Sequence, residues 1–151
     1  MKTIIFSMAL FFVANVNAQW SYKLITDGFD DPYKVAYTES DGLSYLKLEK
    51  SEGKLIFYIK GGYYCDDELL VDFVFSTATE NYKTSLLGQK SKSSEIVFFT
   101  WDLMNESAEF LAWFKKCSNL KIRINETTCT SNYYDFNMGK STATLDFMLK
   151  P

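Results

Sequence analysis

Leu120-Lys121-Ile122-Arg123-Ile124-Asn125 alternates apolar and polar side chains, as a strand does when one face packs on a core and the other meets water. In this phase Arg123 is expected to face outward. Similar short runs, rich in β-branched and aromatic residues, recur between clusters of Gly, Asp, Asn and Ser. They predict strands at residues 22–26, 33–38, 44–49, 54–60, 69–75, 82–87, 95–100, 120–125, 133–137 and 142–149. Such spacing predicts a mainly β fold, an antiparallel β-sandwich of about eight to ten strands.

One segment departs from the strand pattern. Apolar side chains there recur three and four residues apart, as one face of a helix requires: Phe110, Leu111, Phe114 and Cys117. Asn105 can cap the start of this segment, and Lys115 and Lys116 suit the negative C-terminal end of a helix. The sequence therefore predicts one α-helix at about 106–117, packed on one end or face of the sandwich.

The N-terminus has the organisation of a secretory signal peptide. A basic start at Lys2 is followed by a short apolar run and by Val16-Asn17-Ala18, a small-residue cleavage motif before Gln19. The run is shorter than the ~20 residues that a membrane-spanning helix needs. We expect a signal peptide at 1–18 and a single domain at 19–151, exported to the periplasm or secreted, without membrane insertion after cleavage.

Charge and composition narrow the function classes. The formal net charge of −3 becomes one unit more negative when Lys2 is removed, which gives no electrostatic reason to expect nucleic acid. The chain has no histidine, and Arg123 is its only arginine. A Ser-His-Asp or Cys-His centre and a histidine-bound zinc site are thereby excluded. Without a recognisable catalytic motif, the chain is expected to be no enzyme and to use no cofactor or metal.

Three cysteines allow one disulfide and leave one thiol. Cys117 shares its helical face with phenylalanines, where a free cysteine behaves as a small apolar side chain. Cys65 and Cys129 each follow a turn and adjoin polar residues and tyrosines. A Cys65–Cys129 disulfide is the favoured pairing and would contribute ~4 kcal/mol in the chain-entropy model. Cys117 with Cys129 is the alternative, because these two are close in sequence.

Two acidic clusters are candidates for cation binding or hydrolysis: Asp27, Asp30 and Asp31, and Asp66, Asp67 and Glu68. Oxygen ligands can hold calcium, and two carboxylates ~5 to 9 Å apart can hydrolyse a glycosidic bond. The first cluster lacks the alternating ligand pattern of a calcium loop. Solvated turns are the favoured interpretation of both clusters.

Adjacent tyrosines are the candidate contact residues. Tyr63-Tyr64 and Tyr133-Tyr134 lie near the expected disulfide, and a tyrosine at a loop end offers a large rigid surface with a polar tip. Tyr64 and Tyr133 are expected to be exposed, and Arg123 completes the candidate binding set. The alternative is that most aromatic side chains, Trp113 among them, pack in the core.

Two sequons, at Asn105 and Asn125, would accept N-glycans in a eukaryotic secretory pathway. Asn105 already has a use as a helix cap. The Ala-Gln cleavage junction and the lysine-rich, arginine-poor composition favour export from a Gram-negative bacterium.

The C-terminal third contains Leu120–Asn125, Cys129 and the run from Tyr133 to Leu145, in which an aromatic-Phe-Asn-Met segment and a Gly/Ser-Thr-Ala turn lead into a last expected strand. In this order the segment resembles small exported proteins of unknown function. More loosely, it is similar to β-sandwich accessory proteins associated with type VI secretion and with invasion-associated locus B. The cysteine placement differs in those groups. The resemblance implies a secreted β-sandwich and brings no catalytic motif.

Together these features predict an exported, non-enzymatic binding or envelope accessory module. Its expected partner is an envelope or extracellular protein, and a glycan is possible. The alternatives are a carbohydrate-binding module or a carboxylate-based glycoside hydrolase, which would need two carboxylates converging in a cleft.

Overall fold

The computed structural model describes residues 20–26, 32–40, 43–103 and 108–150. Within these ranges the chain forms nine strands and two helices. The strands are β1 (Ser21–Ile25), β2 (Tyr33–Glu39), β3 (Tyr45–Ser51), β4 (Lys54–Lys60), β5 (Glu68–Ser76), β6 (Asn81–Lys90), β7 (Ile96–Asp102), β8 (Asn119–Asn125) and β9 (Asn132–Asn137). The helices are α1 (Ala108–Lys116) and α2 (Ser141–Leu149). The expected signal peptide and the Asn105 cap lie outside the described residues.

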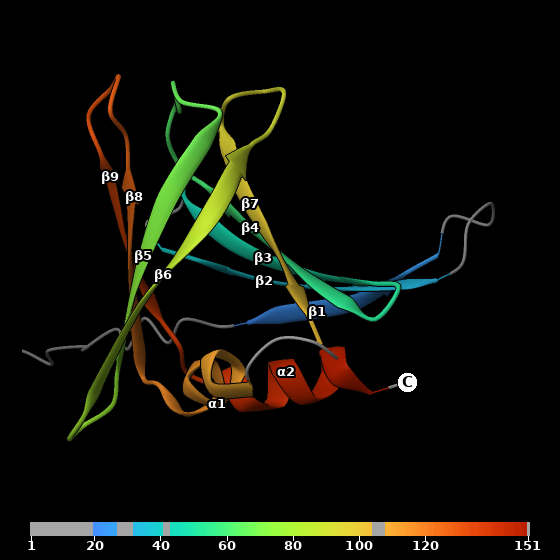
Figure 1. Cartoon of the computed structure of the whole chain (residues 1–151). Coiled ribbons are helices and arrows are strands. Elements are labelled where there is room, and N and C mark those ends of the chain that lie inside the picture. The colour runs from blue at the N-terminus through green and yellow to red at the C-terminus, as the bar shows by residue number, and fades with distance from the viewer. Residues whose placement is uncertain (1–19, 27–31, 41–42, 104–107, 151) are drawn as a thin grey trace, which may run out of the picture.

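All nine strands belong to one antiparallel sheet in the order β1-β2-β3-β4-β7-β6-β5-β8-β9. The predicted mainly β, antiparallel class is confirmed, with the two halves of the sandwich joined in a continuous sheet. The junction is narrow, because β6 and β7 pair only at Gln89 with Phe98 and at Lys90 with Val97. Figure 1 shows the result: β2, β3 and β4 run across the view, whereas β5, β8 and β9 stand upright.

A glycine lies at this junction for a steric reason. A Cβ on Gly88 would lie 2.7 Å from Val97 Cγ1 and 3.0 Å from Val71 Cγ2, closer than packed carbons approach. The bend between the two halves therefore depends on a missing side chain.

The C-terminal segment corrects the sequence prediction. Residues 142–149, expected as a strand, belong to α2, so the described residues form two helices where one was expected. The buried side chains of α2 are spaced as a helical face: Ser141, Thr144, Leu145 and Met148. The hydroxyls of Ser141 and Thr142 donate to the Lys115 carbonyl at the end of α1, 3.0 and 2.8 Å away. These contacts join the helices, and Thr142, expected in a strand, contributes to them from the first turn of α2.

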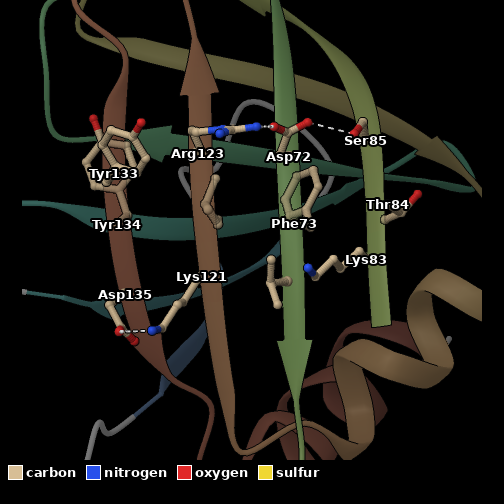
Figure 2. Close-up of a pocket in the computed structure, with 12 residues that line it drawn as sticks. Asp72, Phe73, Lys83, Thr84, Ser85, Lys121, Arg123, Tyr133, Tyr134 and Asp135 are labelled. Atoms are coloured by element: carbon tan, nitrogen blue, oxygen red, sulfur yellow. Dashed lines mark hydrogen bonds and ion pairs between the residues drawn. The ribbon is translucent and has the colours of Figure 1, made fainter. Parts of the chain in front are cut away.

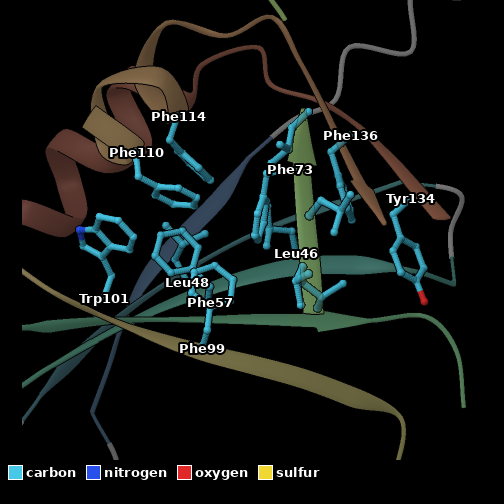
Figure 3. Packing of buried hydrophobic residues seen from close by; sticks show 14 of the residues in the cluster. Leu46, Leu48, Phe57, Phe73, Phe99, Trp101, Phe110, Phe114, Tyr134 and Phe136 are labelled. Atoms are coloured by element: carbon cyan, nitrogen blue, oxygen red, sulfur yellow. The ribbon is translucent and has the colours of Figure 1, made fainter. Parts of the chain in front are cut away.

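One aromatic cluster fills the space between the two halves of the sheet and α1 (Figure 3). Phe110 of α1 is central: its ring centroid lies 4.6 Å from that of Trp101 and 5.4 Å from that of Phe73. Phe73 in turn lies 5.4 Å from Phe99, so β5 of one half contacts β7 of the other. Trp113 stacks on Tyr82 at the margin of this core, 5.3 Å between centroids. Both halves therefore share one hydrophobic core.

The far edge of the sheet returns to the first half. Ser40, after β2, donates its hydroxyl to the Asp135 carbonyl of β9 across 2.6 Å. The loop between β4 and β5 also lies against β9, because a Cβ on Gly62 would lie 2.7 Å from Asn132 Oδ1. Within the described ranges, no helix is both long and apolar enough to span a bilayer.

Candidate functional site

The outer face of the second half of the sheet is hollowed. Side chains of β6, β5, β8 and β9 that point away from the core surround a depression of about 790 Å³ (Figure 2). We call the whole outer side of these four strands the hollowed face and define it by its outward-pointing residues: Leu70, Asp72, Val74, Lys83, Ser85, Leu87, Lys121, Arg123, Asn125, Tyr133 and Asp135. Leu70, Leu87 and Asn125 lie next to the hollow, and the other eight line it. Strand alternation produces it, because the intervening residues point into the core.

An ordered polar network occupies the middle of the hollowed face. Asp72 on β5 accepts hydrogen bonds from Arg123 Nε at 2.9 Å, from Ser85 Oγ at 2.6 Å and from Asn125 Nδ2 at 2.9 Å. Partial burial favours the protonated carboxyl, but these hydrogen bonds outweigh it and lower the pKa of Asp72. The same pairing raises the pKa of Arg123. Asp72 thus stays ionised and fixes the position of the guanidinium.

Two lysines flank Val74 in the next row toward the helices. Lys83 of β6 and Lys121 of β8 are both register partners of Val74. Lys121 lies 3.9 Å from Asp135 Oδ2, with both side chains more than half exposed. Lys83 forms no hydrogen bond or ion pair with any other described residue, and in Figure 2 it reaches from β6 toward β5. This row therefore carries positive charge that the described protein does not neutralise.

Exposed apolar side chains lie around the network. Leu70 and Leu87 are register partners on β5 and β6 and are 49% and 61% exposed. Tyr133 is paired with Arg123 and is 70% exposed. Tyrosine and arginine are enriched among the side chains that dominate protein–protein binding energy. Exposed leucines gain free energy when a partner covers them.

In each of the two tyrosine pairs predicted as contact residues, one tyrosine is exposed and the other is buried. Tyr133 lies on the hollowed face, and Tyr63, 69% exposed, lies in the loop between β4 and β5. Tyr64 and Tyr134 are buried, and their hydroxyls share a 2.7 Å hydrogen bond. Burial, and then this hydrogen bond, raise the pKa of Tyr64. The expectation that Tyr64 is an exposed contact residue is therefore wrong, because the β4–β5 loop turns this ring into the core beside β9.

Arg123 faces outward on β8, as the alternation of 120–125 predicted. Of the candidate contact residues, the hollowed face brings together Arg123 and Tyr133. Tyr134 contributes to the floor of the hollow from the core side, and Tyr63 is not among the lining residues.

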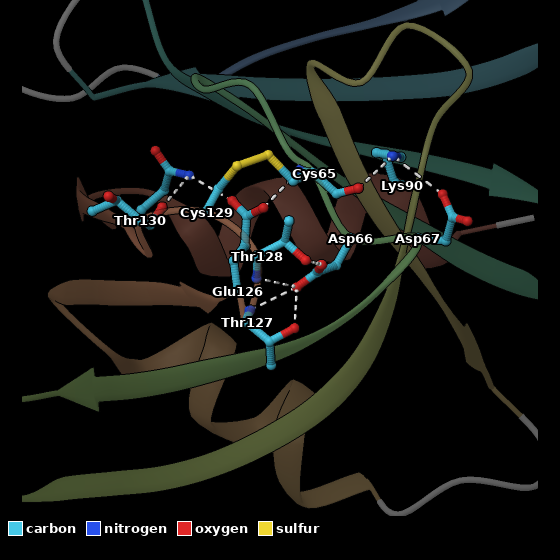
Figure 4. The surroundings of a disulfide bond; sticks show 10 residues. Cys65, Asp66, Asp67, Lys90, Glu126, Thr127, Thr128, Cys129 and Thr130 are labelled. Carbon is cyan, nitrogen blue, oxygen red and sulfur yellow. Dashed lines mark hydrogen bonds and ion pairs between the residues drawn. A yellow bond between two sulfur atoms is a disulfide. The ribbon is translucent and has the colours of Figure 1, made fainter.

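A disulfide joins Cys65 to Cys129, the pairing favoured from the sequence, with 6.0 Å between the Cα atoms. Cys117 is free and buried, and burial raises its pKa to about 12. Figure 4 shows that the disulfide ties the loop before β5 to the β8–β9 turn. Cys65, Glu126 and Cys129 lie close enough together to be considered as metal ligands. Because the two sulfurs are bonded to each other, only the Glu126 carboxylate of this group could bind a metal ion.

Hydrogen bonds beside the disulfide use the second acidic cluster. Asp66 accepts from the backbone N–H of Thr127 at 2.6 Å and from the Thr127 hydroxyl at 3.0 Å, and it also bonds Thr128. The Thr128 hydroxyl bond is the largest cause of a pKa of about 2 for Asp66. Asp67 pairs with Lys90 at 3.1 Å. These carboxylates hold loops together, whereas the cluster at Asp27, Asp30 and Asp31 lies outside the described residues.

The Asn125 sequon is used structurally. Its Nδ2, the atom that an N-glycan would modify, donates to the Leu70 carbonyl at 3.0 Å as well as to Asp72. In the folded protein the Asn125 side-chain amide is therefore held by hydrogen bonds to β5.

Sequence reasoning missed most of the hollowed face, including Leu70, Leu87 and Lys83. The reason lies in the composition of β5, Glu-Leu-Leu-Val-Asp-Phe-Val-Phe-Ser, in which apolar residues occupy both faces. Only Asp72 indicates which side of β5 faces outward, and by alternation it places Leu70 and Val74 on that side. On β6, Leu86 and Leu87 are adjacent and both apolar, so the sequence does not show which of them faces outward.

The chain matches no protein-family model, no curated protein and no solved structure. The chemistry of the hollowed face is accordingly defined by its own residues. They provide one ordered Arg123–Asp72 pair, two lysines beside Val74 and an exposed leucine pair.

Proposed function

We propose that this protein is an exported, non-enzymatic binding module that contacts an envelope or extracellular protein through the hollowed face. The observation that carries the proposal is that exposed Leu70 and Leu87 lie on the same outer side of the sheet as the ordered Arg123–Asp72 network, next to the hollow. Apolar side chains that become buried supply binding free energy. A network that is already ordered loses little conformational entropy on binding.

Tyrosine and arginine favour a protein contact further. Both residue types are enriched among the side chains that dominate protein–protein binding energy. Tyr133 and Arg123 are register partners here, so a partner that covers one also contacts the other. Asp72 holds the guanidinium in place before any partner arrives.

Two features support an exported location. The pattern at residues 1–18 is that of a cleavable signal, and Cys65–Cys129 is a disulfide of the kind that persists in oxidising compartments. The disulfide lies at the end of β8 and β9, and so supports the hairpin that carries Arg123 and Tyr133.

Hydrolysis by paired carboxylates has weaker support. A general acid needs a raised pKa, whereas the pKa of Asp72 is lowered by the donors around it. Asp66, from the second acidic cluster considered for hydrolysis, has a pKa of about 2 and hydrogen-bonds to Thr127 and Thr128. These carboxylates act as hydrogen-bond acceptors in the folded protein.

The test is affinity purification, after crosslinking, of tagged mature protein from the envelope and medium fractions of its own cells. Wild type is compared with Leu87→Lys, and Leu24→Lys is the matched control because Leu24 is a 53% exposed leucine on β1. We expect one stoichiometric protein with wild type and with Leu24→Lys, and its loss with Leu87→Lys. Recovery of the tagged protein alone, or a partner indifferent to Leu87→Lys, would contradict the proposal and direct attention to glycans.

A further inference from the structure

We infer that the partner segment on the hollowed face is extended and carries an apolar and an acidic side chain four residues apart. The apolar side chain packs on Leu70 and Leu87, and the carboxylate binds between Lys83 and Lys121 above Val74. This inference rests on the proposed function and specifies the chemistry of the partner.

The strand register arranges the hollowed face in rows. Leu70 pairs with Leu87, and Val74 pairs with Lys83 on one side and Lys121 on the other. The hollowed face therefore has one row with the Leu70–Leu87 pair, here the apolar row, and one with Lys83, Lys121 and a single acidic residue, Asp135, here the cationic row. The Arg123–Asp72 network lies between them. Leu70 and Val74 are four residues apart on β5, which separates the rows by about 14 Å.

The positive charges of the hollowed face are only partly matched by acidic residues of the described protein. Asp72 is a fixed counterion for Arg123, with hydrogen bonds to both Nε and a terminal nitrogen of the guanidinium. Lys121 has one long ion pair with Asp135, and Lys83 has no ionic or hydrogen-bonded partner among the described residues. A partner that covers the hollow removes water from these ammonium groups, and burial of an unpaired charge is unfavourable. The partner must therefore supply an anion at the cationic row.

The distance between the apolar row and the cationic row favours an extended partner segment. In an extended segment, residues four apart point to the same side and lie about 14 Å apart, which matches the distance between the two rows. A helix returns a side chain to the same face after about seven or eleven residues, which spans about 10 or 16 Å. The extended segment is the better match, with its apolar residue and its Asp or Glu as the two anchors.

Titration of isotope-labelled, disulfide-intact mature protein with short capped peptides, followed by NMR, tests this inference. The probe peptide has the sequence Leu-Ser-Thr-Ser-Asp at its centre. One control peptide replaces the aspartate with asparagine, and a second moves it one residue closer to the leucine, which places the two side chains on opposite sides of an extended chain. The matched protein variants are Lys83→Gln and, on the other half of the sheet, Lys54→Gln, where Lys54 is also an exposed lysine.

We expect the probe peptide to shift signals of both rows and to bind two- to fivefold more tightly than either control peptide, about the effect of an exposed ion pair. Lys83→Gln should abolish the preference for aspartate over asparagine, and Lys54→Gln should retain it. Equal binding of the aspartate and asparagine peptides at Leu70 and Leu87 would overturn the acidic specificity while leaving the proposed function intact. Absence of any shift on the hollowed face at millimolar peptide would also overturn the inference, and the crosslinked purification above decides separately whether this face binds a protein.

Discussion

The two outer faces of the sheet use aromatic and charged residues in opposite ways. On the first half, Tyr37, Lys47, Tyr58 and Phe98 form one row across β2, β3, β4 and β7, which we call the aromatic face. Lys47 Nζ lies 4.1 Å from the Tyr58 ring centroid and 3.0 Å from Glu49 Oε2, so its charge is matched within the protein. On the hollowed face, Lys83 has no such partner among the described residues.

The pKa of Tyr58 is consistent with the packing of its ring on the aromatic face beside Lys47 and Glu49. Burial, and then the charge of Glu49, raise the pKa of its phenol. The aromatic face has more rings than the hollowed face, yet its lysine and tyrosine interact with each other. An unmatched charge on the same face as exposed leucines, rather than aromatic content, therefore distinguishes the candidate contact surface.

The largest expected effect tests whether the two faces belong to one cooperative unit. Phe73 of β5 is buried against rings from β7 and α1, so Phe73→Ala leaves a cavity between the two halves. We expect a loss of about 3–5 kcal/mol in the free energy of unfolding, in a single transition. Urea denaturation followed by both fluorescence and circular dichroism measures it. Two separate transitions would show that the halves are independent and would break the comparison.

The next effect concerns the disulfide between the loop that enters β5 and the turn of the hollowed half. Replacing Cys65 and Cys129 together with alanine is expected to reduce the free energy of unfolding by about 2–4 kcal/mol, because the unfolded chain gains freedom. Chemical denaturation of the double variant and of wild type, both at neutral pH, measures the difference. A loss below about 1 kcal/mol would mean that the Asp66–Thr127 contacts alone hold these loops.

A smaller effect is expected from the network on the hollowed face. Asp72→Asn removes the ionised acceptor of Arg123 and should reduce stability by about 1–2 kcal/mol at neutral pH. Because folding lowers the pKa of Asp72, its ionised form stabilises the native state above the ordinary value of 3.8, and this contribution is lost as the pH falls below it. The difference between wild type and Asp72→Asn should therefore shrink in acid. A constant difference from neutral pH to pH 3 would show that the Asp72 charge is not the source of the stability.

The smallest effect compares one lysine from each face. Lys47→Ala removes a cation–π contact and an ion pair, and we expect it to cost about 0.5–1 kcal/mol. Lys83→Ala removes no hydrogen bond or ion pair with another described residue and should change stability by less than about 0.5 kcal/mol. Thermal unfolding of both variants measures this contrast. Equal losses would indicate that Lys83 has a structural role and would weaken its assignment to a partner.

Much of the fold follows from local patterns in the sequence. The alternation in 120–125 gave the orientation of Arg123, and the spacing of Phe110 and Phe114 located α1. Locating α2 failed because the β-branched Thr142 and Thr144 favour a strand locally, whereas contacts with Lys115 and burial of Leu145 stabilise a helix. Tertiary contacts outweighed local propensity there.

The candidate site was less predictable for the same physical reason. Tyr133 and Tyr134 are neighbours in a strand, so alternation exposes one and buries the other, but the sequence does not say which. Tyr64 lies in a loop, where no periodicity applies, and its burial depends on Tyr134 from a distant strand. The hollow itself arises from four strands that are brought together by long-range pairing.

Site-specific photocrosslinking in the native cells tests the central claim most directly. A benzoylphenylalanine replaces either Tyr133 on the hollowed face or Tyr37 on the aromatic face, and the adducts are identified by mass spectrometry. Both tyrosines are exposed, by 70% and 37%, so each can carry the probe without disturbing the core. The account predicts one discrete protein adduct from position 133 and none from position 37. An adduct from position 37 alone, equal adducts from both positions, or none from either would contradict it.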